Sequence, residues 1–322
     1  MKAAVIYKKG ELPQYTDFPD PIIENENHLL ISVKASAVKN LDKYIASGKH
    51  YSADAKKTAK VAGGDGVGIL EDGTRVYALG VTGMIAEKAI VDKNKIVKVP
   101  EDLDDCTASA LPNAVAGSAM ALRFRANIQK GEAVLINGAT GVTGKIAIQL
   151  AKHYGAARII VTGRNEETLK PLLDLGADEY VILTQPDDDF KAQIKQIHAN
   201  TPIDIIIDYL WGHSAELILK ALKGEGSFTH RTRFVSVGSL AGDSIQLSAE
   251  ILRSVDLQLS GSGLGSWTKD EMKKLVNEIL PEMFELAASK KLVIETVSID
   301  IKDIEKAWDM KIPDGKRLII TI

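Results

Sequence analysis

A glycine-rich turn in the middle of the chain, at residues 138–144, has the spacing that phosphate-binding turns use. Its glycines stand at positions 138, 141 and 144, between an apolar run and a segment with helical periodicity. Glycine lets the backbone turn tightly and approach a ligand closely. The N-terminus of a following helix offers free N–H groups and a positive dipole end to an anion such as a pyrophosphate. The spacing is a variant of the dinucleotide-binding fingerprint, and a plain tight turn is the alternative interpretation.

The strand after this turn ends in a sequence that bears on the choice of coenzyme. In NAD-binding sheets an acidic residue ends the second strand and binds the ribose 2′-hydroxyl. Here Gly163 takes that place, followed by Arg164 and Asn165. Glycine leaves room for a 2′-phosphate, and arginine pairs with phosphate through two hydrogen bonds. We therefore predict NADP(H) rather than NAD(H), the alternative being that Arg164 is a solvated turn residue.

Candidate catalytic side chains gather near the end of the first strands, at Lys39, Asn40, Tyr44 and Tyr51. A lysine can stabilise negative charge that develops on a substrate oxygen. A tyrosine can donate a proton or stack on a flat ring. Each also has an ordinary interpretation, as a solvated lysine or as a tyrosine at a domain boundary. We expect Asp42 to be structural and to hold its own turn through local hydrogen bonds.

Composition excludes several classes of site. The six histidines are scattered, and none is spaced from another as a helical metal pair would be. The single cysteine, Cys106, excludes an internal disulfide and a multi-cysteine metal site, and favours a cytoplasmic protein. Its neighbours Asp104 and Asp105 disfavour a reactive thiolate. The net charge of -3 indicates no nucleic-acid partner, and no apolar run reaches the ~18–20 residues that cross a membrane.

The elements that position these residues form two patterns. Residues 1–118 contain short strands with glycine and proline turns, which predict a small barrel or sandwich. Over residues 119–261 strands alternate with helices, which predicts a parallel, doubly wound α/β sheet. The strands of this sheet are expected at 133–136, 158–162, 180–183, 204–208, 234–237 and 256–260. A long helix over 268–289 should be kinked or split at Pro281, and we expect residues 262–322 to return to the first domain.

The chain resembles the medium-chain dehydrogenase/reductase superfamily, in its zinc-independent quinone oxidoreductase branch. The resemblance covers nearly the whole chain and rests on the order and spacing of four segments, at residues 1–48, 61–92, 108–122 and 137–156. It implies a Rossmann domain that binds NADP(H) at 119–261. It also implies a GroES-like, mostly β catalytic domain that is discontinuous, at 1–118 and 262–322.

The resemblance also implies a set of coenzyme contacts. The pyrophosphate would lie over the glycine turn and its helix, and the nicotinamide near the segment after the fifth strand. The implied contacts are Gly141, Val142, Thr143, Gly144, Tyr209, Val237, Gly238, Ser239 and Ser262. Tyr209 has the alternative of a rim aromatic, and Ser262 that of a domain hinge.

The resemblance further implies that there is no catalytic zinc. The cysteine and histidine ligands of zinc-dependent relatives correspond to Lys39 and Gly64 here, and neither residue can serve as a ligand. The Asn-Pro pair that is usual in the branch is replaced by Lys39 and Asn40, which puts in question any role carried over from the family asparagine.

The activity implied is NADPH-dependent hydride transfer to a quinone-type or conjugated carbonyl acceptor. Such an acceptor can take its proton from solvent, so the site needs no acid–base pair. Two alternatives stay open: an NADPH-dependent reductase of enones, enals or enoyl thioesters, and a non-catalytic NADPH-binding protein. A short-chain dehydrogenase/reductase is excluded, because no Tyr-x-x-x-Lys pair occurs. The expected partner is a small-molecule acceptor, with no nucleic acid or membrane, and a homodimer through the exposed sixth strand is possible.

Overall fold

The computed structural model describes residues 1–48, 59–224, 226, 229–313 and 315–322. The chain divides into two compact units. Unit 1 consists of Met1–Pro112 with Lys273–Ile322, and unit 2 of Asn113–Met272. Unit 2 therefore extends somewhat beyond the predicted Rossmann segment, 119–261, at both of its ends.

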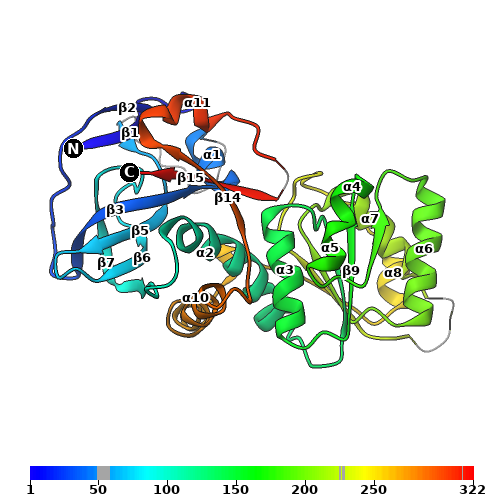
Figure 1. Cartoon of the computed structure of the whole chain (residues 1–322). Coiled ribbons are helices and arrows are strands. Elements are labelled where there is room, and N and C mark those ends of the chain that lie inside the picture. The colour runs from blue at the N-terminus through cyan, green and yellow to red at the C-terminus, as the bar shows by residue number, and fades with distance from the viewer. Residues whose placement is uncertain (49–58, 225, 227–228, 314) are drawn as a thin grey trace. The chain divides into compact units, whose positions relative to one another are not determined.

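Unit 2 is built on a six-stranded sheet in which every neighbouring pair of strands is parallel (Figure 1). The strand order is β10-β9-β8-β11-β12-β13, which is the doubly wound order with its switch point between β8 and β11. The strands are β8 (Ala133–Asn137), β9 (Arg158–Gly163), β10 (Glu179–Ile182), β11 (Ile205–Asp208), β12 (Thr232–Ser236) and β13 (Leu257–Gly261). β8 and β11 are buried along their whole length, as their apolar runs predict.

Helices connect the strands of unit 2: α3 (Val142–His153), α4 (Glu166–Leu169), α5 (Pro171–Asp174), α6 (Asp187–Asn200), α7 (Gly212–Ala221) and α8 (Ala249–Ser254). α4 and α5 are two short helices in the segment after β9. Pro171 stands at the first position of α5, and proline has no N–H with which to continue the preceding helix. The apolar faces of α6 and α7 share a buried core with the sheet, made by Leu135, Ile206 and Phe234 among others.

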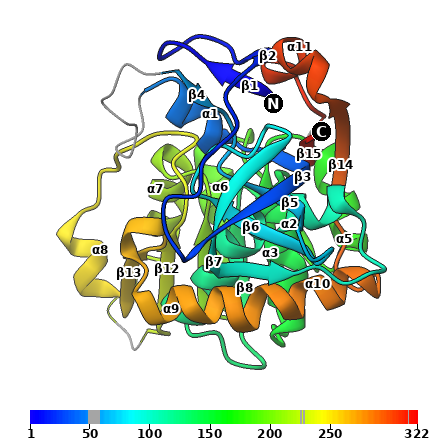
Figure 2. The same cartoon turned by 90° about the vertical axis from the view of Figure 1, so that its left-hand side faces the viewer.

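Unit 1 contains a mixed sheet in the order β14-β15-β3-β5-β6-β7. β3 also pairs with β7, so that the four strands β3, β5, β6 and β7 form a closed barrel (Figure 2). The strands are β3 (His28–Val38), β5 (Asp65–Leu70), β6 (Arg75–Gly80), β7 (Lys88–Lys98), β14 (Glu295–Asp300) and β15 (Lys316–Thr321). A smaller sheet, β2-β1-β4, is formed by β1 (Lys2–Ile6), β2 (Gln14–Asp17) and β4 (Lys60–Val61). The predicted fold class, a Rossmann sheet with a mostly β domain, is confirmed.

The C-terminal segment pairs with the N-terminal strands. β15 is antiparallel to β3, with Leu318 opposite Val38, and β14 is parallel to β15. In Figure 1 these strands, in red, lie beside β3, in blue. Further helices are α1 (Asn40–Ala46), α2 (Asp105–Met120) and α11 (Ile304–Trp308), and short 3₁₀ turns lie at Leu264–Ser266 and Ile301–Asp303.

The long helix predicted over 268–289 is interrupted, as Pro281 led us to expect. It consists of α9 (Lys269–Lys274), a π-helical segment (Leu275–Ile279) and α10 (Leu280–Ala288), with Pro281 in the first turn of α10. Proline gives no hydrogen bond to the turn before it, and the π-helical segment is that preceding turn. Another π-helical turn, η1 (Ala121–Arg125), follows α2. Within the described residues, no helix is both long and apolar enough to cross a membrane.

Candidate functional site

The glycine turn leads directly from β8 into α3. Gly141 is the N-cap residue of α3, and the first turn of the helix carries no acidic side chain, so nothing on the helix itself neutralises its positive end. The third glycine, Gly144, is buried. A Cβ built on Gly144 would lie 2.5 Å from Ala139 Cα, whereas one built on Gly141 would meet nothing within 4 Å. The two glycines thus have different roles: Gly144 permits close packing of the turn, and Gly141 leaves its outer surface open.

A buried polar network supports the turn at the carboxyl ends of the strands. The Asn137 side-chain amide donates to Asp208 Oδ1 at 2.8 Å and to Ser214 Oγ at 3.0 Å, and Thr162 Oγ1 donates to Asn137 Oδ1 at 2.6 Å. Asn137, Thr162 and Asp208 have no exposed surface. The sequence analysis did not single out Asn137 or Thr162. The available signal was that each stands at or next to the end of an apolar strand, where a polar residue requires a partner.

Asp208 holds the turn after β11. Its carboxylate accepts hydrogen bonds from the backbone N–H of Leu210, at 3.0 Å, and of Trp211, at 3.1 Å. Trp211 adopts φ of 57°, which is unusual for a residue with a side chain. Burial raises the pKa of Asp208, although these N–H groups and Asn137 act in the opposite direction. The hydrogen bonds that the Asp208 carboxylate accepts therefore fix the backbone conformation at this edge of the sheet.

Residues Gly117 and Ser118 of α2 lie against several of the predicted coenzyme contacts. Ser118 Oγ donates to the Thr143 carbonyl at 3.1 Å and is 3.0 Å from the Tyr209 hydroxyl. A Cβ on Gly117 would lie 3.2 Å from Thr143 Cγ2 and 3.9 Å from Val237 Cγ1. Tyr209 is only 7% exposed, and burial raises its pKa well above the ordinary value. The alternative interpretation of Tyr209 as a rim aromatic is therefore wrong.

The segment after β12 lies beside the end of β11. The backbone N–H groups of Val237 and Gly238 both donate to the Asp208 carbonyl, at 2.7 and 3.2 Å, and Ser239 follows them at the surface. The structure therefore brings the predicted contacts at 141–144, 209 and 237–239 to one edge of one sheet. This is the carboxyl edge, where open α/β sheets bind their ligands.

Gly163 ends β9 in a closed environment. A Cβ at this position would lie 2.8 Å from Thr140 Cγ2 and 2.9 Å from Leu169 Cδ2. Side chains of the unit itself thus leave no room for a Cβ, which explains why glycine stands here, and the coenzyme contact at Gly163 stays a prediction. Arg164 is exposed, and Asn165 caps α4 by accepting from the Glu167 N–H at 2.9 Å. Among the described residues, no hydrogen bond or ion pair involves the Arg164 guanidinium.

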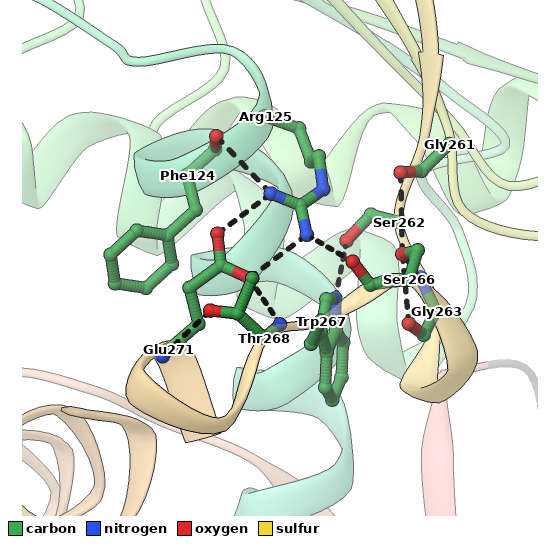
Figure 3. Close-up of polar contacts among 9 residues, drawn as sticks. All are labelled: Phe124, Arg125, Gly261, Ser262, Gly263, Ser266, Trp267, Thr268 and Glu271. Carbon is green, nitrogen blue, oxygen red and sulfur yellow. Dashed lines mark hydrogen bonds and ion pairs between the residues drawn. The ribbon is translucent and has the colours of Figure 1, made fainter. Parts of the chain in front are cut away.

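Ser262 lies just beyond β13 and is held on two sides. Its N–H donates to the Ser236 carbonyl at 2.8 Å, and its hydroxyl accepts from Trp267 Nε1 at 3.0 Å (Figure 3). Only 5% of the residue is exposed. Because the hydroxyl accepts from Trp267, a contact between Ser262 and the coenzyme would use the O–H donor of the same hydroxyl.

A two-pronged ion pair fixes the segment that follows Ser262. Arg125 donates to both carboxylate oxygens of Glu271, at 2.8 and 3.0 Å, and to the Ser266 carbonyl at 2.6 Å (Figure 3). The N–H of Thr268 also donates to Glu271, at 2.7 Å. The sequence analysis missed this pair, because its partners are far apart in the chain.

In unit 1, Lys39 lies inside a buried ionic cluster. Only 4% of its side chain is exposed. The ammonium group donates to the Ala37 carbonyl at 3.1 Å and to Asp65 Oδ1, and it lies 3.2 Å from Asp42 Oδ2. Since an ammonium has three N–H bonds, these three neighbours account for all of them. The interpretation of Lys39 as a solvated lysine is wrong, and its predicted role as a direct substrate contact is corrected, because no N–H is left for a substrate oxygen.

Other buried polar groups complete this cluster. Tyr77 donates its hydroxyl to Asp65 Oδ2 at 2.7 Å, and burial together with Asp65 raises the pKa of Tyr77 well above its ordinary value. Burial by itself would lower the pKa of Lys39, but the carboxylates of Asp42 and Asp65 outweigh it and raise the pKa. Arg317 is also buried, and burial lowers its pKa although both carboxylates attract it.

Helix α1 carries the remaining candidate residues. Asp42 accepts a hydrogen bond from the Lys39 N–H at 2.8 Å, which confirms that Asp42 holds its own turn. Asn40 opens the helix and is exposed, and Tyr44 is 48% exposed. Tyr51 lies outside the described residues. Unit 1 therefore presents Asn40 and Tyr44 at its surface and keeps Lys39 inside.

A surface hollow of about 450 Å³ lies at the opposite edge of the unit 2 sheet from the glycine turn. Its lining includes Glu132, Asp204 and Arg231, which precede β8, β11 and β12. These are the amino ends of the parallel strands. The hollow is therefore separate from the coenzyme edge.

The chain matches part of a family whose description includes zinc binding, so we asked whether its residues could hold a zinc ion. The model of the zinc-binding dehydrogenase family matches residues 142–280. The residues that the structure describes do not fit a zinc ion. The described part of the chain contains no group of three or more metal-ligating side chains, and the Lys39 ammonium fills the space between the two carboxylates of the unit 1 cluster.

The proteins that are similar over most of the chain include quinone reductases. A probable NADPH-dependent quinone reductase of Emericella nidulans is 26% identical over 96% of this chain and 96% of its own length. The human quinone oxidoreductase is 28% identical over 85% of this chain and 83% of its own length.

Solved structures share the fold. A mycobacterial quinone oxidoreductase matches with a TM-score of 0.86 at 20% identity, over 100% of both chains. The quinone oxidoreductase of Thermus thermophilus, which was also solved with NADPH, matches with a TM-score of 0.78 at 23% identity, again over 100% of both chains. Over most of its length the chain is therefore similar to the quinone oxidoreductase branch of the medium-chain dehydrogenase/reductase superfamily, and it shares the fold of quinone oxidoreductase structures.

Proposed function

We propose that this protein transfers hydride from NADPH to a quinone-type or conjugated carbonyl acceptor without a catalytic metal. The observation that carries the proposal is the glycine turn at the carboxyl edge of the unit 2 sheet, in a chain that is similar to the quinone oxidoreductase branch. The relatives named above support NADPH as the reductant and a quinone as one class of acceptor.

The residues of the chain contribute mainly orientation in this proposal. NADPH supplies the hydride when bound. The open surface at Gly141 and the N-terminus of α3 receive the pyrophosphate, since both face the edge with unpaired N–H groups. The network of Asn137, Thr162 and Asp208 holds the turn in place beforehand, which reduces the cost of binding. The reduced acceptor oxygen takes its proton from solvent.

Arg164 should select NADPH over NADH. It is exposed directly after β9, and arginine binds phosphate through charge-assisted hydrogen bonds. We expect Arg164→Ala to raise the Kd for NADPH by roughly tenfold or more and to leave the Kd for NADH nearly unchanged. Calorimetric titration of both coenzymes measures this. Lys170→Ala is a matched control, since Lys170 is a nearby exposed cation that pairs with Glu166. Equal losses for NADPH and NADH, or none, would contradict the assignment.

A screen of NADPH oxidation tests the function itself. The purified chain is offered ortho- and para-quinones, enones, enals and enoyl thioesters, each with NADPH and with NADH. Saturable turnover of quinones supports the proposal. Turnover of enones or enoyl thioesters with no quinone activity would favour the conjugated-carbonyl reductase alternative. NADPH binding without oxidation by any acceptor would favour the non-catalytic alternative.

A further inference from the structure

The ionic cluster of unit 1 balances its charge internally. Lys39 and Arg317 supply two buried cations, and Asp42 and Asp65 supply two buried carboxylates. Each carboxylate also accepts a hydrogen bond from a neutral group: Asp65 from the Tyr77 hydroxyl, and Asp42 from the Gly64 N–H at 3.2 Å. A buried charge is tolerated only when it is paired and hydrogen-bonded, and Lys39, Asp42 and Asp65 meet that condition without an added ion.

The cluster joins four elements of unit 1. Lys39 and Asp42 belong to the N-terminus of α1, Asp65 opens β5, Tyr77 lies in β6, and Arg317 lies in β15. The Lys39 ammonium is the group that contacts both carboxylates. This cation therefore links α1 to β5, and α1 carries Asn40 and Tyr44 at its exposed face.

We propose that Lys39 is a built-in cation: its ammonium group takes the place of a metal ion between Asp42 and Asp65 and positions helix α1. Lys39 is thus a positioning residue rather than a catalytic one. The proposal rests on the proposed function only in assigning a substrate role to Asn40 and Tyr44. Its test needs neither coenzyme nor acceptor, so its failure is distinguishable from failure of the proposed function.

The first test is Lys39→Met, which keeps the length of the side chain and removes the charge. Within the described residues of the cluster, Asp42 and Asp65 then keep Arg317 as their one buried cation, so a large loss is expected. We expect the Tm at pH 8 to fall by roughly 6–20 °C. Lys43→Met, on the same helix, is the matched control and should change the Tm by about 2 °C or less.

The pH dependence separates charge from packing. Burial already raises the pKa of Asp42, and the Lys39 ammonium opposes that rise, so removal of Lys39 should raise the pKa of Asp42 further. A raised carboxyl pKa contributes stability at low pH that is lost as the pH rises through it. The Tm deficit of Lys39→Met should therefore be smaller at pH 5.5 than at pH 8. An equal deficit at both values would mean that Lys39 acts by packing alone and would overturn the proposal.

A second variant keeps the proposal testable if Lys39→Met does not fold. Lys39→Met combined with Asp65→Asn leaves one buried cation of the cluster, Arg317, opposite one carboxylate, Asp42. We expect the double variant to fold and to regain at least half of the Tm lost in Lys39→Met. A double variant that is no more stable than the single one, or that fails to fold, would overturn the proposal. So would stoichiometric zinc, measured by elemental analysis, in the wild-type chain after expression in zinc-supplemented medium.

Discussion

Gly144→Ala should both destabilise unit 2 and abolish tight NADPH binding, whereas Gly141→Ala should affect binding alone. The Cβ of Gly144→Ala would lie 2.5 Å from Ala139 Cα and 2.6 Å from the Ala139 carbonyl oxygen, and backbone atoms cannot move aside as a flexible side chain can. The start of α3 must then shift away from the turn. We expect a loss of about 1–3 kcal/mol in the free energy of unfolding, measured by urea denaturation, and a rise in the Kd for NADPH of roughly tenfold or more.

Gly141→Ala is the matched control variant, since Gly141 lies at the start of the helical turn that contains Gly144. Its Cβ meets nothing within 4 Å, and its φ of -76° suits any residue, so the free energy of unfolding should change by about 0.5 kcal/mol or less. If the pyrophosphate lies over this glycine, the added methyl group keeps it from the N–H groups of α3, and the Kd for NADPH rises. Unchanged NADPH affinity in a stable Gly141→Ala protein would place the coenzyme elsewhere.

Glu271→Gln should lower the stability of unit 2 at neutral pH, and the loss should shrink as the pH falls from 4.5 toward 2. The ordinary pKa of this carboxyl is 4.5, and the hydrogen bonds from Arg125, followed by those from Thr268, lower it to about 2. A lowered folded-state pKa contributes stability that is present above the unfolded pKa and is lost as the pH falls toward the folded one. The window is therefore pH 4.5 to 2. Because the side chains of the pair are 16–17% exposed, we expect about 1–3 kcal/mol at pH 7.

Urea unfolding of wild type and Glu271→Gln at several values between pH 7 and pH 3 measures this effect. Glu166→Gln is the control, because Glu166 pairs with Lys170 through a side chain that is 48% exposed, and surface pairs contribute little. A stability difference that does not change between pH 7 and pH 3 would show that Glu271 acts through packing rather than through its charge.

Local sequence patterns were enough to predict the Rossmann unit and the position of its glycine turn. Apolar runs predicted β8 and β11, and the glycine spacing at 138–144 predicted the entry into α3. These features are local: a buried strand, a tight turn and an amphipathic helix each leave a pattern within about ten neighbouring residues. Pro281 predicted the break in the C-terminal helix for the same reason, since proline acts on the turn that contains it.

The partners of the charged and polar side chains, and so their roles, became known only from the tertiary structure. We predicted that Lys39 is solvated or contacts the substrate, because its partner Asp65 lies 26 residues away in sequence. Arg125 and Glu271 are 146 residues apart, and Asn137 and Asp208 are 71 apart. The space beside Gly163 is filled by Thr140 and Leu169, which the residue type could not indicate. Whether a polar group is solvated or buried depends on the partners that satisfy it, and distant segments supply those partners only when the chain has folded.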